Sequence, residues 1–284
     1  MKIIFGVNTL TAVEQPVYAS HVNFFYKVGK EYPDMVCALN TPRRMSIDRM
    51  RNQTAKYALE GEFDYLMFID DDVSIPADTL RKLLACDADI AAGWTIIRGY
   101  PFPNMFFRHQ NGDKDTLENY PTKDFTPGEV VSCDAVGFSC VLIKSSLLRK
   151  VPPPWFVTGT NNTEDIYFCM KARHLFPETT IVVDTSIKTD HALGTEFIGP
   201  DNLVNYRKYC EKTYPEMYVP KEIQDERDKI AFGDRGYEYL EMVKTGKPLL
   251  ADLDTRVSCT DKEHAGYGSK FCATCAKVKS RVKK

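Results

Sequence analysis

The stretch DYLMFIDDDVSIP, residues 64–76, decides how the rest of the chain is interpreted. An apolar run of strand length leads directly into three consecutive aspartates, and a proline closes the stretch. Adjacent like charges repel one another, and neither helices nor strands favour them. Two interpretations follow: aspartates that accept backbone hydrogen bonds and cap the next helix, or a site where oxygen ligands hold a divalent cation. We expect the metal site, because three carboxylates are more than capping requires.

The composition is that of a globular protein, with 284 residues, 43% of them hydrophobic and 27% charged, and a net charge of −2. Nine cysteines, an odd count at irregular spacing, favour a reducing compartment over a disulfide framework. The N-terminal run MKIIFGVNTLTA is broken by Gly6 and Asn8, which indicates a core strand rather than a signal peptide. No stretch approaches transmembrane length. We therefore expect a cytoplasmic protein, cellular or made by a virus in its host, with no membrane partner.

Strand and helix patterns alternate in the first half of the chain. Strands are expected at 2–7, 34–39, 64–69 and 89–97, and helices at 16–30, 41–61 and 76–87. Such alternation predicts a parallel sheet covered by helices on both faces. Ligands bind such sheets beyond the carboxyl ends of the strands, where Asp70, Asp71 and Asp72 fall.

The second half is more varied. Loops with one short strand near MFFR are expected over 101–128, two β-prone runs and a short helix over 130–151, a helix over 161–176, strands at 179–184 and 186–192, and helices over about 200–247. The later strands close a mixed sheet. We expect three parts: an α/β domain over 1–199, a helical extension over 200–255 and a tail over 256–284.

Several segments, in this order, resemble GT-A-fold glycosyltransferases of the large family-two-like group. Arg51 and Asn52 open a helical stretch, an apolar strand follows, and it ends in the Asp-x-Asp pattern of Asp70 to Asp72. The segment AVGFSCVLIKSSLL (135–148) is similar to the acceptor-side strand and helix of that family. Glu164 and Asp165 resemble its Glu-Asp motif, and TDHA (189–192) places a histidine after the last strand. The resemblance covers about residues 1–195 and implies a Rossmann-like GT-A mixed sheet flanked by helices.

The resemblance also implies a donor site for a nucleotide-diphosphate sugar, with a UDP-sugar favoured. A bound Mn²⁺ or Mg²⁺ would neutralise the charge that grows on the leaving diphosphate. Asp72 would bind the metal directly and His191 would be the second protein ligand, although a lone histidine can equally be a satisfied core residue. Asp70 would lie near the ribose or the metal's waters. The expected donor contacts are Thr9, Arg51, Asn52, Asp70 and Asp72.

The acceptor hydroxyl must lose a proton as it attacks, which requires a base within hydrogen-bond reach. The resemblance places Asp165 in that role with Glu164 beside it, and implies inversion at the anomeric carbon. The simpler alternative is that both carboxylates only complement the helix dipole. The glycine-rich stretch expected before this pair is replaced here by PPPWFVTGTNN. That departure leaves the shape of the acceptor pocket open.

The last stretch, CTDKEHAGYGSKFCATC (259–275), has the spacing Cys-x4-His-x7-Cys-x2-Cys. We expect Cys259, His264, Cys272 and Cys275 to hold a structural Zn²⁺, although unrelated thiols would give the same composition. A run of basic residues follows: Lys277, Lys279, Arg281, Lys283 and Lys284. It is either a solvated tail or a contact to nucleic acid.

Three hypotheses for function remain. The leading one is an inverting, metal-dependent glycosyltransferase acting on hydroxymethylated pyrimidines in DNA, because a zinc knuckle and a basic tail without a membrane segment resemble viral enzymes of that kind. The second keeps the enzyme but changes the acceptor to a glycan or a protein. The third is a non-enzymatic, zinc-dependent nucleic-acid-binding protein whose aspartates only cap.

Overall fold

The computed structural model describes residues 1–9, 13–99, 101–110, 113–159, 163–193 and 196–213. All of them belong to the first of the two units into which the chain divides, Met1–Lys229. The expected zinc ligands, the basic tail and the helical stretch beyond residue 213 lie outside the described residues.

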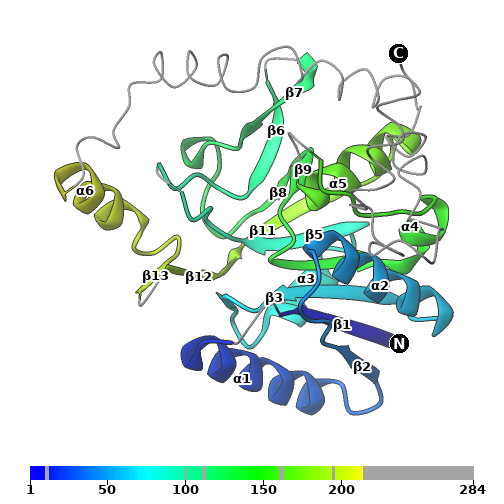
Figure 1. The fold of residues 1–284 in the computed structure, drawn as a ribbon. Helices are drawn as coiled ribbons and strands as arrows, with labels where there is room; N and C mark the ends of the chain where they lie inside the picture. The colour runs from blue at the N-terminus through cyan, green and yellow to red at the C-terminus, as the bar shows by residue number, and fades with distance from the viewer. Residues whose placement is uncertain (10–12, 100, 111–112, 160–162, 194–195, 214–284) are drawn as a thin grey trace, which may run out of the picture. The chain divides into compact units, whose positions relative to one another are not determined.

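The described residues build a seven-stranded sheet (Figure 1). In spatial order its strands are β2 (Val36–Asn40), β1 (Lys2–Asn8), β3 (Tyr65–Asp70), β10 (Cys140–Lys144), β5 (Ile90–Trp94), β11 (Ile181–Lys188) and β8 (Val130–Ser132). β1 runs parallel to β2 and β3, and β11 runs parallel to β5. β10 lies antiparallel between β3 and β5, and β8 is antiparallel to β11. The expected α/β class with a mixed sheet is confirmed.

Two three-stranded sheets flank the main one. The first contains β13 (Glu196–Ile198), β12 (Asp190–Leu193) and β4 (Val73–Ser74), and the second β7 (Asp113–Asn119), β6 (Phe106–Gln110) and β9 (Ala135–Val136). In the first sheet His191 pairs with Val73. This register brings the late histidine next to the aspartates that end β3.

Helices cover both faces of the main sheet, each face with its own apolar core. Packed on one face are α1 (Gln15–Glu31) and α3 (Thr79–Ala85), and on the other α2 (Ile47–Glu60), α4 (Ser145–Lys150) and α5 (Glu164–Leu175). A short 3₁₀ turn (Thr122–Asp124) and α6 (Leu203–Thr213) complete the described elements. Side chains of β1 alternate between the faces, so Phe5 packs against Phe24 of α1, whereas Ile4 belongs to the core that contains Ala55 of α2.

Two helices begin later than the sequence predicts. We expected a helix from Thr41, but α2 begins at Ile47 after Ser46. The reason is that Pro42 accepts a hydrogen bond from the N–H of Thr9, which extends the β1 edge into this loop. α3 likewise begins at Thr79, because the carbonyl of Pro76 is bonded by both the N–H and the hydroxyl of that residue.

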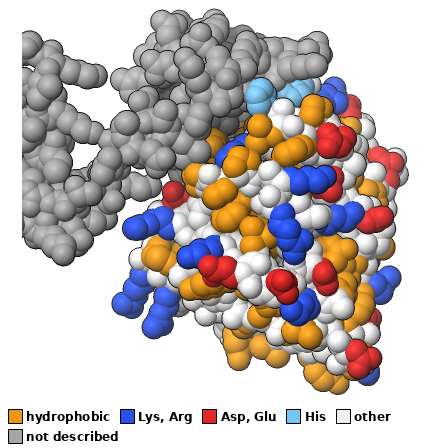
Figure 2. All heavy atoms as spheres, turned by 90° about the vertical axis from the view of Figure 1, so that its right-hand side faces the viewer, with side chains coloured by type: hydrophobic (Ala, Val, Ile, Leu, Met, Phe, Trp, Pro, Cys, Tyr) orange, Lys and Arg blue, Asp and Glu red, His pale blue; other side chains and the backbone are white. Residues whose placement is uncertain are grey.

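The described surface carries no large single-sign patch on the face that lies to the right in Figure 1. On that face basic, acidic and apolar side chains are interspersed (Figure 2). No helix among the described residues is long and apolar enough to cross a membrane.

Candidate functional site

A buried arginine organises the carboxylates at the ends of β3 and α5. Arg51, on the first turns of α2, is 3% exposed. Its Nη2 lies 3.1 Å from Oδ1 of Asp70, and its Nη1 lies 2.9 Å from Oε1 of Glu164 in an ion pair whose angle is outside the hydrogen-bond range. The guanidinium sits 5.4 Å from the ring centres of both Phe68 and Phe138. A cation near two aromatic rings is stabilised by their electron density, in addition to its two acidic partners.

One arginine cannot neutralise two buried carboxylates. Burial raises the pKa of Asp70 to about 6, against the opposing pull of Arg51. Burial also raises the pKa of Glu164 to about 7, with Arg51 again opposing and the neighbouring Asp165 adding to the rise. The cluster therefore has a tendency to hold a proton near neutral pH.

Asp72 and His191 face one another at the entrance of the site. Nδ1 of His191 lies 2.9 Å from the carbonyl oxygen of Ile96, and since a carbonyl only accepts, this nitrogen carries a proton. Nε2 then points at Asp72, 3.6 Å from its Oδ1. In a neutral ring this is an unshared electron pair facing a carboxylate, an arrangement that is favourable only with a proton or a cation between the two. Burial acts to raise the pKa of Asp72, but His191 and Arg98 outweigh it and lower the pKa below its usual value.

The predicted ligand set is therefore brought together in part. Asp72 and His191 converge, whereas Asp70 is turned toward Arg51. Among the described residues no group of three or more His, Cys, Asp or Glu side chains is placed to hold a metal. Two protein ligands still suit Mg²⁺ or Mn²⁺, because such ions usually complete their shell with water and substrate phosphates. The donor set of one carboxylate and one oriented imidazole thus fits a divalent cation.

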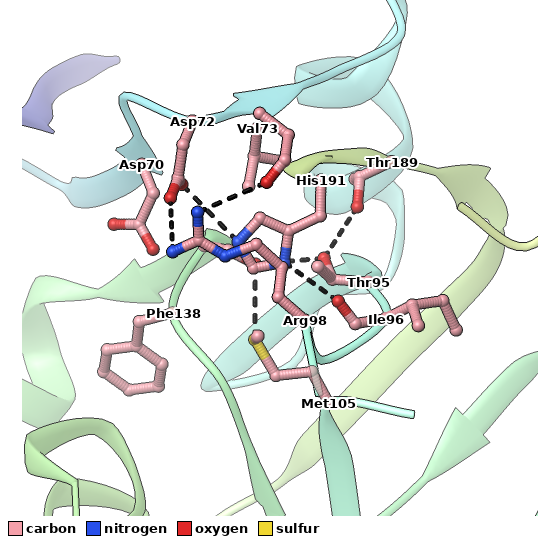
Figure 3. A network of polar contacts seen from close by, with 12 residues as sticks. Asp70, Asp72, Val73, Thr95, Ile96, Arg98, Met105, Phe138, Thr189 and His191 are labelled. Atoms are coloured by element: carbon pink, nitrogen blue, oxygen red, sulfur yellow. Dashed lines mark hydrogen bonds and ion pairs between the residues drawn. The ribbon is translucent and has the colours of Figure 1, made fainter. Parts of the chain in front are cut away.

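Arg98, which the sequence analysis did not single out, supplies a positive charge at this point. Its Nη2 lies 2.8 Å from Oδ2 of Asp72, and its Nη1 donates to the carbonyl of Ala192 at 3.2 Å (Figure 3). Arg98 and Arg51 explain why the run of aspartates is tolerated, because Asp72 and Asp70 are each paired with one of these arginines. The signal for Arg98 was its place just beyond the apolar strand β5, where polar side chains reach the carboxyl edge of the sheet.

Asp165 lies at the start of α5, half-buried, and is tied to the site by the segment 137–139. Its Oδ2 accepts a hydrogen bond from the N–H of Phe138 at 3.3 Å. On the other side of this segment the carbonyl of Ser139 accepts from the N–H of Asp70 at 2.9 Å. A Cβ on Gly137 would lie 2.2 Å from Cγ of Met105, so the close approach here requires glycine. Residues 137–139 therefore join Asp165 to the end of β3 at Asp70.

Two expected donor contacts have a different part in the structure. The side chain of Asn52 donates to the carbonyls of Asp48 at 2.7 Å and Phe156 at 2.6 Å, and its oxygen accepts from the N–H groups of Trp155 at 2.9 Å and Phe156 at 3.3 Å. These bonds occupy the donors and acceptors of the Asn52 amide, and they tie the segment 152–156 to α2. Arg51 is enclosed by Asp70 and Glu164, which orients it toward the carboxylates rather than outward.

The end of β1 carries a further polar group that sequence reasoning missed. Asn8 pairs in register with Asp70, is 3% exposed, and neither its amide nitrogen nor its oxygen has a hydrogen-bond partner within the described structure. Thr9, the expected nucleotide contact, follows at the strand end, with its N–H bonded to Pro42. Buried amides without partners are rare, so this edge is suited to a polar ligand that supplies both a donor and an acceptor.

Comparison with solved structures gives 194 matching chains, among them three distant likenesses. They are A197 from STIV (TM-score 0.46, 18% identity, covering 71% of this chain and 91% of that one), GalNAc-T7 with UDP, GalNAc and Mn²⁺ (0.43, 11%, 78% and 51%), and S. aureus TarS 1–349 (0.36, 15%, 66% and 58%). The chain thus spans only about half of the GalNAc-T7 chain. No protein-family model and no curated protein matches the sequence. At these TM-scores the likenesses assign neither an activity nor a site, so the proposals below depend on the chain's own residues.

Replacing Asn52 with Ala should destabilise the protein, because it leaves the N–H groups of Trp155 and Phe156 without an acceptor. We expect a loss of about 1–3 kcal/mol in the free energy of unfolding, measured by equilibrium urea denaturation. Gln53→Ala, one position along the same helix, is the control and should stay within about 0.5 kcal/mol of wild type. If Asn52→Ala kept wild-type stability but bound nucleotide more weakly, Asn52 would be a donor contact after all.

Glu164→Gln should change how stability depends on pH. Because the pKa of Glu164 is raised to about 7, its contribution is complete below the unfolded pKa and is lost as pH rises through the folded value. Gln releases no proton, so the free energy of unfolding of the variant should rise relative to wild type between about pH 5 and pH 8. Urea denaturation at both pH values measures this. Glu178→Gln on the surface is the control, and a difference for Glu164→Gln that is constant with pH would contradict the assignment.

Proposed function

We propose that the chain is an inverting glycosyltransferase that moves a sugar from a nucleotide-diphosphate sugar to a hydroxyl acceptor. The observation that carries the proposal is the opposition of Asp72 and Nε2 of His191, with a half-buried carboxylate, Asp165, whose partner segment 137–139 also bonds the backbone of Asp70 at the end of β3. A cation-holding pair beside a candidate base is what this transfer requires: one part for the leaving diphosphate and one for the attacking hydroxyl. The resemblance noted from the sequence supports the same assignment.

On the donor side, Asp72 and His191 would hold Mn²⁺ or Mg²⁺. Such an ion, when bound, supplies positive charge to the leaving diphosphate. The hydrogen bond from His191 to Ile96 fixes the ring in the orientation that presents Nε2. Asn8 and Thr9 lie at the end of β1 next to Asp70, and we assign them to the nucleoside, with a UDP-sugar favoured as donor.

On the acceptor side, the burial of the two neighbouring acids separates their roles. Glu164 is 6% exposed and engaged with Arg51, so it cannot reach an incoming hydroxyl without breaking a buried ion pair. Asp165 is half-buried, and its Oδ2 is held by the N–H of Phe138. We therefore assign the proton-accepting role to Asp165 and a positioning role to Glu164.

Asp165→Asn should abolish most of the turnover while leaving donor binding intact. The amide keeps the size of the side chain and can still accept from Phe138, but it cannot take up a proton. We expect a fall in kcat of about 10²–10⁴-fold, measured as release of nucleotide diphosphate from a panel of UDP- and GDP-sugars. Asp87→Asn, a change of the same kind at a surface aspartate paired with Lys144, should not alter kcat. A loss under about threefold would move the base to another residue.

For the acceptor we propose a hydroxymethylated pyrimidine in DNA, with a glycan or a protein hydroxyl as the alternative. The support is the sequence of the tail alone: the Cys-x4-His-x7-Cys-x2-Cys spacing and the basic run behind it. The mixed surface in Figure 2 offers no comparable basic stretch on that face of the described residues. We assign the contact with a phosphate backbone to the basic run of the tail. If the chain is instead a non-enzymatic zinc-dependent nucleic-acid-binding protein, nucleotide sugars will not turn over.

Deleting residues 256–284 should raise KM for duplex DNA that carries hydroxymethylated pyrimidines, without changing the KM for the donor. Affinity for DNA should fall with added salt, and the deletion should flatten that dependence because fewer counterions are released. Cys272→Ser with Cys275→Ser should mimic the deletion and lose one bound zinc, as determined by metal analysis. Absence of zinc together with unchanged kinetics on DNA would assign the acceptor to a glycan or a protein.

A further inference from the structure

Arg98 lies on a tight turn that begins just after β5. The N–H of Ile97 donates to the carbonyl of Pro103 at 2.9 Å, and Ile96 bridges to Asn104, so the chain reverses over residues 97–103. From this turn the side chain, 44% exposed, reaches back over the end of the sheet to Asp72 and to the carbonyl of Ala192 (Figure 3). Its guanidinium thus lies at the carboxylate that we assign to the divalent cation.

The two oxygens of Asp72 have different partners. Oδ1 faces Nε2 of His191 at 3.6 Å, and Oδ2 is bound by Nη2 of Arg98 at 2.8 Å. A guanidinium and a divalent cation bound to one carboxylate would lie a few ångströms apart and would carry three positive charges in total. Their repulsion disfavours simultaneous binding. Arg98 therefore has to leave Asp72, at least in part, before this carboxylate can hold such an ion.

The backbone of the turn is anchored by α6. Arg207 of α6 donates to the carbonyls of Pro101 at 2.6 Å and Phe102 at 2.8 Å, and the ring of Tyr206 packs edge-on against Phe102 at 5.4 Å. The long side chain of Arg98 extends from this anchored backbone. A diphosphate next to Asp72 would give the displaced guanidinium an anionic partner that matches its planar set of donors.

We propose that Arg98 is a displaceable counterion that exchanges Asp72 for the donor's diphosphate and so makes cation binding and nucleotide binding depend on one another. This inference rests on the proposed function, since it takes Asp72 as a metal ligand. In the absence of nucleotide the Asp72–Arg98 ion pair competes with the cation. With nucleotide present the same arginine gains a partner instead of losing one. The coupling is reciprocal, so each ligand strengthens the binding of the other by the same factor.

The test is calorimetric and needs no turnover: titration of the full chain with Mn²⁺ alone, and with Mn²⁺ together with UDP or GDP. Arg98→Gln should bind Mn²⁺ alone about two- to fivefold more tightly than wild type, the size expected for removal of a competing exposed ion pair. It should bind the nucleotide–Mn²⁺ pair about tenfold more weakly, because a charged hydrogen-bond donor to the diphosphate is lost. The factor by which nucleotide improves Mn²⁺ affinity should shrink accordingly.

Two variants control for charge and for site. Arg81→Gln removes the same charge from another exposed arginine paired with an aspartate, Asp78, at 3.1 Å, and should behave as wild type. Asp72→Ala should lose Mn²⁺ binding whether or not Arg98 is present. If Arg98→Gln and wild type bind Mn²⁺ alone equally well, and both retain nucleotide binding, this inference is wrong while the proposed function stands. If wild type binds no Mn²⁺ with either nucleotide, the proposed function fails as well.

Discussion

The buried guanidinium of Arg51 is the interaction on which the arrangement of the site depends. It stands between the end of β3 and the start of α5, paired with Asp70 on one side and with Glu164 on the other. Removing one partner from such a cluster leaves an uncompensated charge, which costs far more than the net stabilisation that the intact pair supplies. Phe68 and Phe138 enclose the guanidinium further and exclude water from it. The two acids are thereby fixed relative to each other by one side chain of α2.

The cluster around Arg51 gives the carboxylates of the site different roles. Arg51 pairs with Asp70 and Glu164, which leaves Asp72 and Asp165 as the carboxylates that we assign to ligands. The groups around these two carboxylates differ in charge. Asp72 lies near Arg98 and His191, which keep its pKa low and its oxygens ionised. Among the residues that the structure describes, the hydrogen-bond donors to the oxygens of Asp165 are backbone N–H groups. One edge is therefore suited to holding a cation and the other to accepting a proton.

Many of the strands and helix ends could be predicted, because they depend on local sequence patterns. The apolar runs 2–7 and 64–69 lie largely in strands of the sheet, and the run 89–97 is a strand only over Ile90–Trp94. Gly61 and Thr163 end and begin helices as expected. The meeting of Asp72 and His191 was expected only from the resemblance to glycosyltransferases. No local signal indicated that β10 would insert antiparallel between β3 and β5, because strand pairing across long separations is decided by the whole core.

The two expected donor contacts on α2 both have partners inside the protein. Asn52 and Arg51 have the types and the position expected of ligand contacts, yet Asn52 hydrogen-bonds to Phe156, and Arg51 is paired with Asp70 and Glu164. A polar residue on a helix next to a site can face the ligand or the protein, and its spacing does not distinguish the two. Two of the partners of Asn52, Trp155 and Phe156, lie about a hundred positions away in the sequence, which is beyond the reach of any local pattern.

The contact of α6 with the 97–103 turn crosses the boundary that was expected at residue 199. Every strand of the seven-stranded sheet lies before residue 199, which is why a boundary there looked natural. Arg207 nevertheless supplies the donors for two carbonyls of the turn, from a position after that boundary. A fragment cut at residue 199 would retain the complete sheet and lose the support of the arginine that faces Asp72. A piece of the chain that keeps this support therefore has to extend at least through Arg207.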